Sequence, residues 1–85
     1  MHTFTVDPGG RILWCLRRRV SDVRCVLYVG SAAADVQILQ ERDPVLTERF
    51  PNEASALRWA EEYRDRLLQQ GWRRSPQDCS PSSAA

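Results

Sequence analysis

The segment from Phe50 to Trp72 constrains the fold most, because it carries a start signal, an apolar stripe and a stop signal for one helix. Asn52 is a good N-cap, since its side-chain oxygen can accept from the free N–H groups of a first helical turn. Gly71 can adopt the left-handed conformation that ends a helix, and Trp72 would then contact Leu67 as in a Schellman ending. We therefore predict one amphipathic helix that begins after Asn52 and buries a wide apolar face.

The apolar stripe of this helix indicates what it packs against. At 100° per residue, its apolar and small side chains fall on one side and most of its charged side chains fall on the other. The stripe consists of Ala56, Leu57, Ala60, Tyr63 and Leu67, with Trp59 and Leu68 at its flanks. Because two stripe residues are alanine, the helix can lie close to a sheet.

Four short segments that precede the helix are predicted strands, because they are rich in β-branched and aromatic residues and are bounded by turn residues. They span residues 11–18, 24–29, 36–42 and 45–50, with turns at 20–22 and 42–44 and a loose connection at 30–34. Consecutive strands with short connections form an antiparallel meander. The predicted class is α+β: a four-stranded antiparallel meander sheet with one C-terminal helix packed on one face (β-β-β-β-α).

The chain of 85 residues is long enough for one domain. We assign residues 1–10 to an N-terminal extension and residues 11–72 to a single β4-α domain. Residues 73–85 are rich in Ser, Pro and Ala, so they are predicted to be a disordered tail. A domain this small has a marginal core, which makes a homodimer the default expectation.

The first hairpin determines which side chains share a face of the sheet. A two-residue loop at Val20 and Ser21 would pair Trp14 with Leu27 and Leu16 with Cys25 on the inner, helix-facing side. Cys15 and Cys25 then point to opposite faces and cannot form a disulfide with each other. A slip of one residue would make them neighbours, so the register decides this point. On the later strands, the residues predicted to face inward are Val36, Ile38, Leu46 and Phe50.

The outer face of the predicted sheet combines basic and apolar side chains. Arg11, Arg17 and Arg24 lie there with Tyr28, and this mixture of cations and a ring is typical of single-stranded nucleic-acid binding. In this register Arg17 stands opposite Arg24, which is unfavourable unless an anionic group such as Glu41 lies between them.

A second interpretation of the same face is a protein interface. Leu13, Val26, Tyr28 and Leu39 would form an apolar patch that a second copy of the chain could cover. The leading hypothesis is therefore a non-enzymatic interaction module that forms a homodimer and acts through its outer sheet face or an edge strand. The partner is the chain itself or another protein, and the alternative is a single-stranded nucleic-acid binder.

No arrangement of residues indicates catalysis. His2 has no nucleophile near it in sequence, and Glu61 and Glu62 diverge because they are adjacent on a helix. Cys15 and Cys25 have no neighbouring base and are interpreted as buried thiols. We therefore expect no enzymatic activity and no cofactor.

Composition narrows the classes of protein to which this chain can belong. With one histidine and no C-x-x-C motif, the sequence predicts no metal site, and no run of residues approaches the length of a membrane span. An odd cysteine count without a secretory signal favours a cytoplasmic protein with no disulfide framework. All twelve basic residues are arginine, which indicates GC-rich coding and a bacterial origin.

Two segments carry a family resemblance: an Arg-Cys-Val-Leu strand and, after it, the segment F-P-x-E-A-x-A-L-x-W-A-E-E-x-R-x-x-L-x-x-x-G-W. With these segments, residues 11–72 resemble small uncharacterised bacterial proteins. That resemblance implies no activity and assigns no functional residue. In the order of its elements alone, the chain is similar to the Whirly and positive-cofactor-four group of single-stranded DNA binders. The Lys-Gly-Lys-Ala motif of Whirly proteins has no counterpart in this lysine-free chain.

Overall fold

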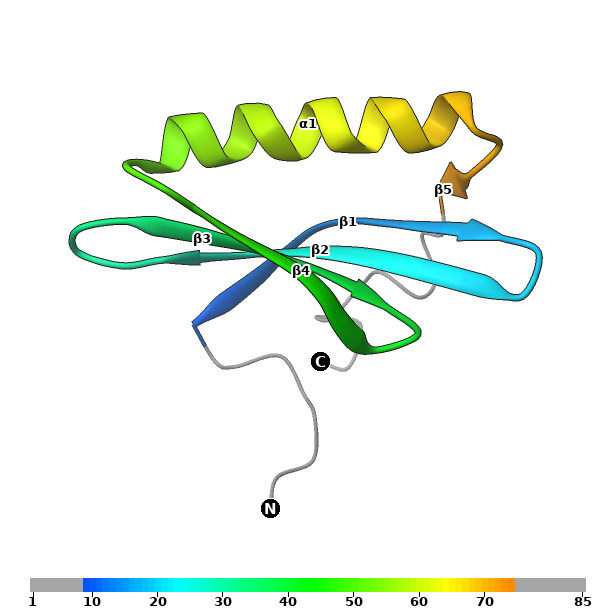
Figure 1. Ribbon diagram of the computed structural model, residues 1–85, viewed down its shortest axis with the longest axis horizontal. Helices are drawn as coiled ribbons and strands as arrows, with labels where there is room; N and C mark the ends of the chain where they lie inside the picture. The colour runs from blue at the N-terminus through cyan, green and yellow to red at the C-terminus, as the bar shows by residue number, and fades with distance from the viewer. Residues whose placement is uncertain (1–8, 75–85) are drawn as a thin grey trace, which may run out of the picture.

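Five strands form one antiparallel sheet, and one helix lies along one of its faces, in the computed structural model, which describes residues 9–74. Figure 1 shows the helix as a separate layer over the sheet. The strand order is β4-β3-β2-β1-β5. The elements are β1 (Gly10–Arg18), β2 (Ser21–Val29), β3 (Ala34–Gln40), β4 (Asp43–Phe50), α1 (Glu53–Gln69) and β5 (Arg73–Arg74). The predicted α+β class, with a four-stranded meander followed by one helix, is confirmed.

The register of the first hairpin differs from the predicted one by two residues. The loop is Arg19-Val20, so Trp14 pairs with Cys25 and Leu16 pairs with Val23. A shift of two residues preserves the face of each side chain, and Trp14, Leu16 and Cys25 therefore still face the helix. A bulge at Leu13 shifts the register by one further residue. Residues 10–12 of β1 therefore lie on the opposite face of the sheet from the one predicted.

The β3–β4 turn is tighter and earlier than predicted. Glu41 and Arg42 form it with φ values of 51° and 74°, which is the twist that two-residue hairpin loops require. Asp43 and Pro44, predicted to belong to the turn, are the first residues of β4. Pro44 is tolerated there for two reasons: β4 is an edge strand, and Pro44 directly precedes the bulge at Val45.

Arg42 should be replaceable by glycine with a gain in stability. A side chain at φ 74° is strained, whereas glycine adopts this conformation freely, so we expect Arg42→Gly to raise the free energy of unfolding by about 0.5–1 kcal/mol. Arg42→Ala is the matched control, because it removes the same side chain but keeps the strain. Urea denaturation of the two variants measures the difference, and equal stabilities would contradict the strain argument.

The core lies between α1 and the inner face of the sheet. Val36 and Ile38 are fully buried, and Leu46 and Phe50 pack against the same cluster, as their strand positions predict. From the helix, Ala56 and Ala60 are buried at 0% and 1% exposure, which confirms that the small residues bring α1 close to the sheet.

Both predicted ends of α1 are confirmed. Asn52 caps the start, with its Oδ1 accepting a hydrogen bond from Ser55 N at 2.8 Å. At the other end, Gly71 has φ 100°, and the N–H of Trp72 donates to Leu67 O at 3.1 Å. Gly71 N also donates to Leu68 O at 3.2 Å, which completes a Schellman motif.

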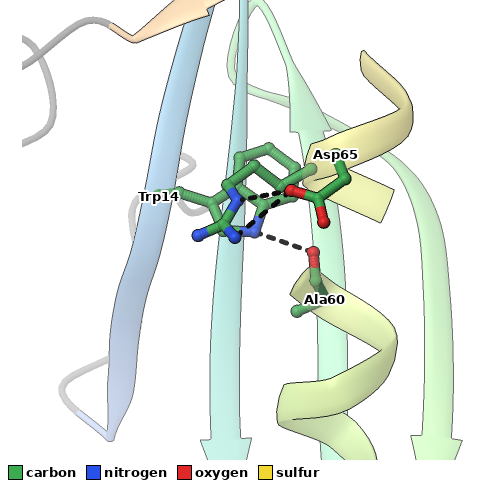
Figure 2. A network of polar contacts seen from close by, with 4 residues as sticks. Trp14, Ala60 and Asp65 are labelled. Atoms are coloured by element: carbon green, nitrogen blue, oxygen red, sulfur yellow. Dashed lines mark hydrogen bonds and ion pairs between the residues drawn. The ribbon is translucent and has the colours of Figure 1, made fainter. Parts of the chain in front are cut away.

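Aromatic residues connect α1 to both halves of the sheet. The Trp14 indole nitrogen donates to the carbonyl oxygen of Ala60 at 3.1 Å (Figure 2). The rings of Trp14 and Tyr63 stack at 6.2 Å, and Trp59 lies between Tyr63 and Phe50 at 5.1 and 5.6 Å. This row positions the helix across the sheet from β1 to β4.

The domain extends further than predicted at its C-terminal end. Arg73 and Arg74, assigned from sequence to a disordered tail, form β5 and pair with Arg17 and Leu16 of β1. The rest of that tail, residues 75–85, and most of the N-terminal extension, residues 1–8, lie outside the described residues.

Candidate functional site

The sheet face opposite α1, called here the outer face, is organised in rows of paired residues. Residues directly opposite each other on antiparallel strands project to the same side of the sheet. The rows are Arg17 and Asp22; Cys15, Arg24 and Leu39; Ile12, Val26 and Gln37; and Tyr28, Asp35 and Arg49. Predicted candidates Arg17, Arg24 and Tyr28 therefore share this face.

Arg17 and Arg24 do not oppose each other, which corrects the predicted pairing. In the observed register Arg17 pairs with Asp22, and Arg24 pairs with Cys15. Opposite charges thus face each other at the end of the β1–β2 hairpin, which is the favourable arrangement. Glu41 reaches the same corner, where its carboxylate accepts a hydrogen bond from Asp22 N at 2.9 Å.

Arg11 lies on the helix side of the sheet, not on the outer face. It precedes the bulge and pairs with Leu27, an inner-face residue. Its Nη2 lies 3.2 Å from Glu53 Oε2 at the start of α1. The sequence prediction misplaced Arg11 because a bulge at Leu13 has no recognisable signal in the sequence.

An exposed ion pair occupies the β3–β4 end of the outer face. Arg49 Nε and Nη2 donate to Asp35 Oδ1 and Oδ2 at 2.9 and 3.2 Å. The hydrogen bond from Arg49 lowers the pKa of the Asp35 carboxyl below its ordinary value. A shallow pocket adjoins the pair and is lined by Tyr28, Val29, Gly30, Ala32, Ala33, Asp35 and Arg49. Because Asp35 already binds the guanidinium, Arg49 is poorly suited to hold a phosphate there.

The apolar outer-face residues are buried, unlike the exposed patch that the sequence predicts. Val26 and Leu39 are 0% and 1% exposed, and Tyr28 is half-buried. Leu13 is half-buried at the bulge and packs against the inner core. Leu13 therefore does not belong to the outer face, and Val26 and Leu39 are not open to a partner in this structure.

The two cysteines of the first hairpin lie on opposite faces, as predicted, and differ in chemical state. Cys25 is a free, fully buried thiol that faces the helix, and burial raises its pKa from 9.0 to about 12. Cys15 is 3% exposed on the outer face and is disulfide-bonded. The expectation of a buried thiol is thus confirmed for Cys25 and wrong for Cys15.

Cys25 should make stability fall at high pH. The unfolded thiol loses its proton near pH 9, whereas the folded thiol keeps it until about pH 12. The stabilisation from this group is complete below pH 9 and is lost between about pH 9 and 12, at up to about 1.4 kcal/mol per pH unit. Urea denaturation of wild type and Cys25→Ala at several pH values isolates this slope. Parallel pH dependences of the two proteins would contradict it.

β4 forms an open edge of the sheet within the described residues. Six of its eight residues are exposed, and Val45, the extra residue of a bulge, is 56% exposed. On the helix side, Leu46 and Phe50 of β4 are half-buried, and so is the neighbouring Trp59 of α1. We call Leu46, Phe50, Trp59 and the free backbone of β4 the β4 margin.

Within residues 9–74, no group of three or more His, Cys, Asp or Glu side chains could hold a metal ion. The one helix in that part of the chain is neither long nor apolar enough to cross a membrane. The fold and its surfaces define a small α+β domain with one helix on an antiparallel sheet.

The chain gives no significant match to any family model, to any curated protein or to any solved structure. The resemblances argued from the sequence therefore stay predictions.

Proposed function

We propose that this protein is a non-enzymatic interaction module that forms a homodimer by pairing the β4 edges of two copies. The observation that carries the proposal is the open edge of β4, a regular stretch from Leu46 to Phe50 beyond the bulge. An edge strand presents unpaired N–H and C=O groups that a second strand can bind.

The apolar side chains of the β4 margin support the same proposal. Leu46, Phe50 and Trp59 are only half-buried, although each packs against the core. A second copy that extends the sheet would cover these three side chains while its backbone pairs with β4. This burial adds the apolar area that a domain of this size lacks.

A second copy of the chain fits this edge better than a highly charged partner. The formal net charge is +1, so two copies repel each other little. Between Leu46 and Phe50, β4 carries one acidic residue, Glu48, and one basic residue, Arg49, so the pairing stretch has no net charge. β1 is less suitable as an edge, because β5 already pairs with it at Leu16 and Arg17.

Two adjacent proline variants test the pairing. Consecutive residues of a strand direct their N–H groups to opposite edges of that strand. One of the two variants Thr47→Pro and Glu48→Pro therefore removes a hydrogen bond from β4 to β3. The other, called here the outward variant, removes only an N–H group that points away from the sheet. We expect the outward variant to keep the wild-type circular dichroism and to sediment as a monomer where wild type is a dimer. The inward variant serves as the matched control, since it should lose stability instead.

The proposal fails if wild type sediments as a monomer at all concentrations up to near-millimolar. It also fails if the well-folded proline variant remains a dimer, because the interface would then lie elsewhere.

Single-stranded nucleic-acid binding through Arg17, Arg24 and Tyr28 stays a secondary prediction. The three residues share the outer face, but Asp22 and Asp35 stand in the same rows. Arg11, the fourth predicted contact, pairs with Glu53 on the other side. A labelled oligonucleotide that shows no mobility shift at low salt would exclude this function.

A further inference from the structure

Exposed arginines gather at one corner of the sheet, where β5 pairs with the end of β1. Arg73 and Arg74 form β5, which lies at the opposite edge of the sheet from β4. Arg18 is the last residue of β1, and Arg19 follows it in the turn to β2. Figure 1 shows β5 beside the end of β1 that leads into this turn. We call the four exposed residues Arg18, Arg19, Arg73 and Arg74 the basic edge.

Within residues 9–74, no acidic side chain forms an ion pair with the basic edge. Ion pairs in that part of the chain involve Arg11, Arg49 and Arg64 instead. The formal net charge of the whole chain is only +1, so the basic edge is a local concentration of positive charge on a nearly neutral protein. Like charges held close together repel one another, and a bound polyanion relieves that repulsion.

Arg18 has a fixed position within the basic edge. Its Nη1 donates to the carbonyl oxygen of Gln70 at 3.0 Å, and its guanidinium lies over the Trp72 ring, 4.9 Å from the ring centroid. A guanidinium carries five N–H donors, so Arg18 keeps donors for a ligand after its bond to Gln70 is made. The ring contact therefore holds a cation in place before any anion arrives.

The cations of the basic edge lie on both sides of the sheet. Arg73 pairs with Arg17, so its side chain projects to the outer face, whereas Arg74 pairs with Leu16 and projects to the helix side. Arg18 also lies on the helix side, against the end of α1. A ligand that contacts the whole set must be narrow and flexible and must carry several negative charges.

The phosphate backbone of a single-stranded nucleic acid has these properties. The planar fork of a guanidinium matches phosphate oxygens with two parallel hydrogen bonds, and every cation of the basic edge is an arginine. Trp72, the ring nearest to these cations, is only 7% exposed, so it offers no open surface on which a base could stack. Contacts to phosphates alone carry no direct sequence information.

A flat anionic lipid surface fits this corner less well. Figure 1 shows the β1–β2 and β3–β4 turns at the same end of the sheet. Glu41 in the second turn and Asp43 at the start of β4 are exposed there. A lipid surface that touched this whole end would repel both carboxylates, whereas a narrow strand that follows β5 avoids them.

We propose that the basic edge binds the phosphate backbone of a single-stranded nucleic acid without sequence preference. The site differs from the outer-face residues Arg17, Arg24 and Tyr28 considered above. Because β5 and β4 are opposite edges of the sheet, this binding does not depend on the proposed dimer, and either proposal can fail alone.

Titration of a fluorescently labelled oligo(dT) with the full-length protein, followed by anisotropy, tests the proposal. Four phosphate contacts predict that the logarithm of the binding constant falls with the logarithm of the salt concentration with a slope of about −2.8, at about 0.7 per contact. Oligo(dA) should bind with nearly the same slope. No change in anisotropy at low salt would overturn the proposal, and so would binding that salt does not weaken.

A pair of double variants locates the site. Arg73→Gln with Arg74→Gln should weaken binding by about tenfold or more at about 50 mM salt and reduce the magnitude of the slope by about 1.4. Arg42→Gln with Arg58→Gln is the matched control, because it removes the same charge from exposed positions in the β3–β4 turn and on α1. Equal weakening by the two double variants would show that only net charge matters, which contradicts a site at the basic edge.

Further variants and a second probe separate the alternatives. Arg19→Gln lies in the loop outside β5, so it should reduce the magnitude of the slope by about 0.7 even if the β5 variant loses structure. Tyr28→Ala, folded by circular dichroism, should bind as wild type does. A loss on Tyr28→Ala as large as that of the β5 variant would place the site on the outer face instead. Binding to phosphatidylserine vesicles but not to the oligonucleotide would assign the basic edge to a lipid surface. Either result would overturn the proposal.

Discussion

Replacing Trp72 with alanine is expected to lower the free energy of unfolding by about 3–5 kcal/mol. Trp72 is 7% exposed, and its side chain belongs to the core cluster between α1 and the sheet. Its ring also lies 4.9 Å below the guanidinium of Arg18, which bonds the helix end through Gln70 O at 3.0 Å. Since small domains often have only about 5 kcal/mol of stability, much of this variant should be unfolded at 25 °C.

Two variants separate the parts of this effect. Trp72→Phe keeps an aromatic ring and should lose less than half as much stability as Trp72→Ala. Arg18→Ala removes the cation over the ring and the bond to Gln70, so it should cost only about 1 kcal/mol. Thermal and urea denaturation measure all three. A Trp72→Ala protein with nearly wild-type stability would show that the C-terminal end of α1 is not part of the core.

The second large effect is expected for Ile38→Ala, at about 2–5 kcal/mol. Ile38 is 1% exposed and stands between Cys25 of β2 and Leu46 of β4 on the inner face. Ile38 belongs to the same buried cluster as Ala56 and Ala60 of α1, so removal of its side chain leaves a cavity in the closely packed core between helix and sheet.

Val20→Ala is the control for Ile38→Ala, because Val20 is 89% exposed in the β1–β2 turn. We expect a change of at most about 0.5 kcal/mol there. Similar losses for the two variants would contradict the assignment of Ile38 to the core.

Local signals predicted α1 well. The cap at Asn52, the glycine at position 71 and the contact of Trp72 with Leu67 all depend on neighbours in sequence, and each is present. The inward positions of Val36, Ile38, Leu46 and Phe50 follow from strand periodicity and are also correct. These features needed no knowledge of which strands pair.

The turns were harder to predict because their residues are atypical. Arg19, Glu41 and Arg42 have φ values between 51° and 74°, a region usually occupied by glycine or asparagine. Because neither loop contains glycine or asparagine as a marker, the sequence prediction placed both hairpin loops about one residue too late. The sequence did not predict β5, because two consecutive arginines carry no strand signal. Arg73 and Arg74 form a strand by pairing with the edge of β1.

The candidate site was likewise predicted correctly where strand periodicity determines it, and wrongly where the structure departs from that periodicity. The shared face of Arg17, Arg24 and Tyr28 survived because an error of two residues preserves side-chain direction. Arg11 and Leu13 were misplaced because the bulge alters direction at that point. The burial of Val26 and Leu39 depends on what lies over the sheet, which periodicity along a strand cannot report.

Hydrogen–deuterium exchange of the β4 amides, measured as a function of protein concentration, tests the proposed dimer most directly. Alternate N–H groups of an edge strand point away from the sheet and exchange quickly in a monomer. If two copies pair through β4, exchange from Leu46 to Phe50 should slow as the concentration rises from micromolar to near-millimolar, while exchange in the buried β2 stays constant. Exchange rates in β4 that do not change over this range would contradict the account.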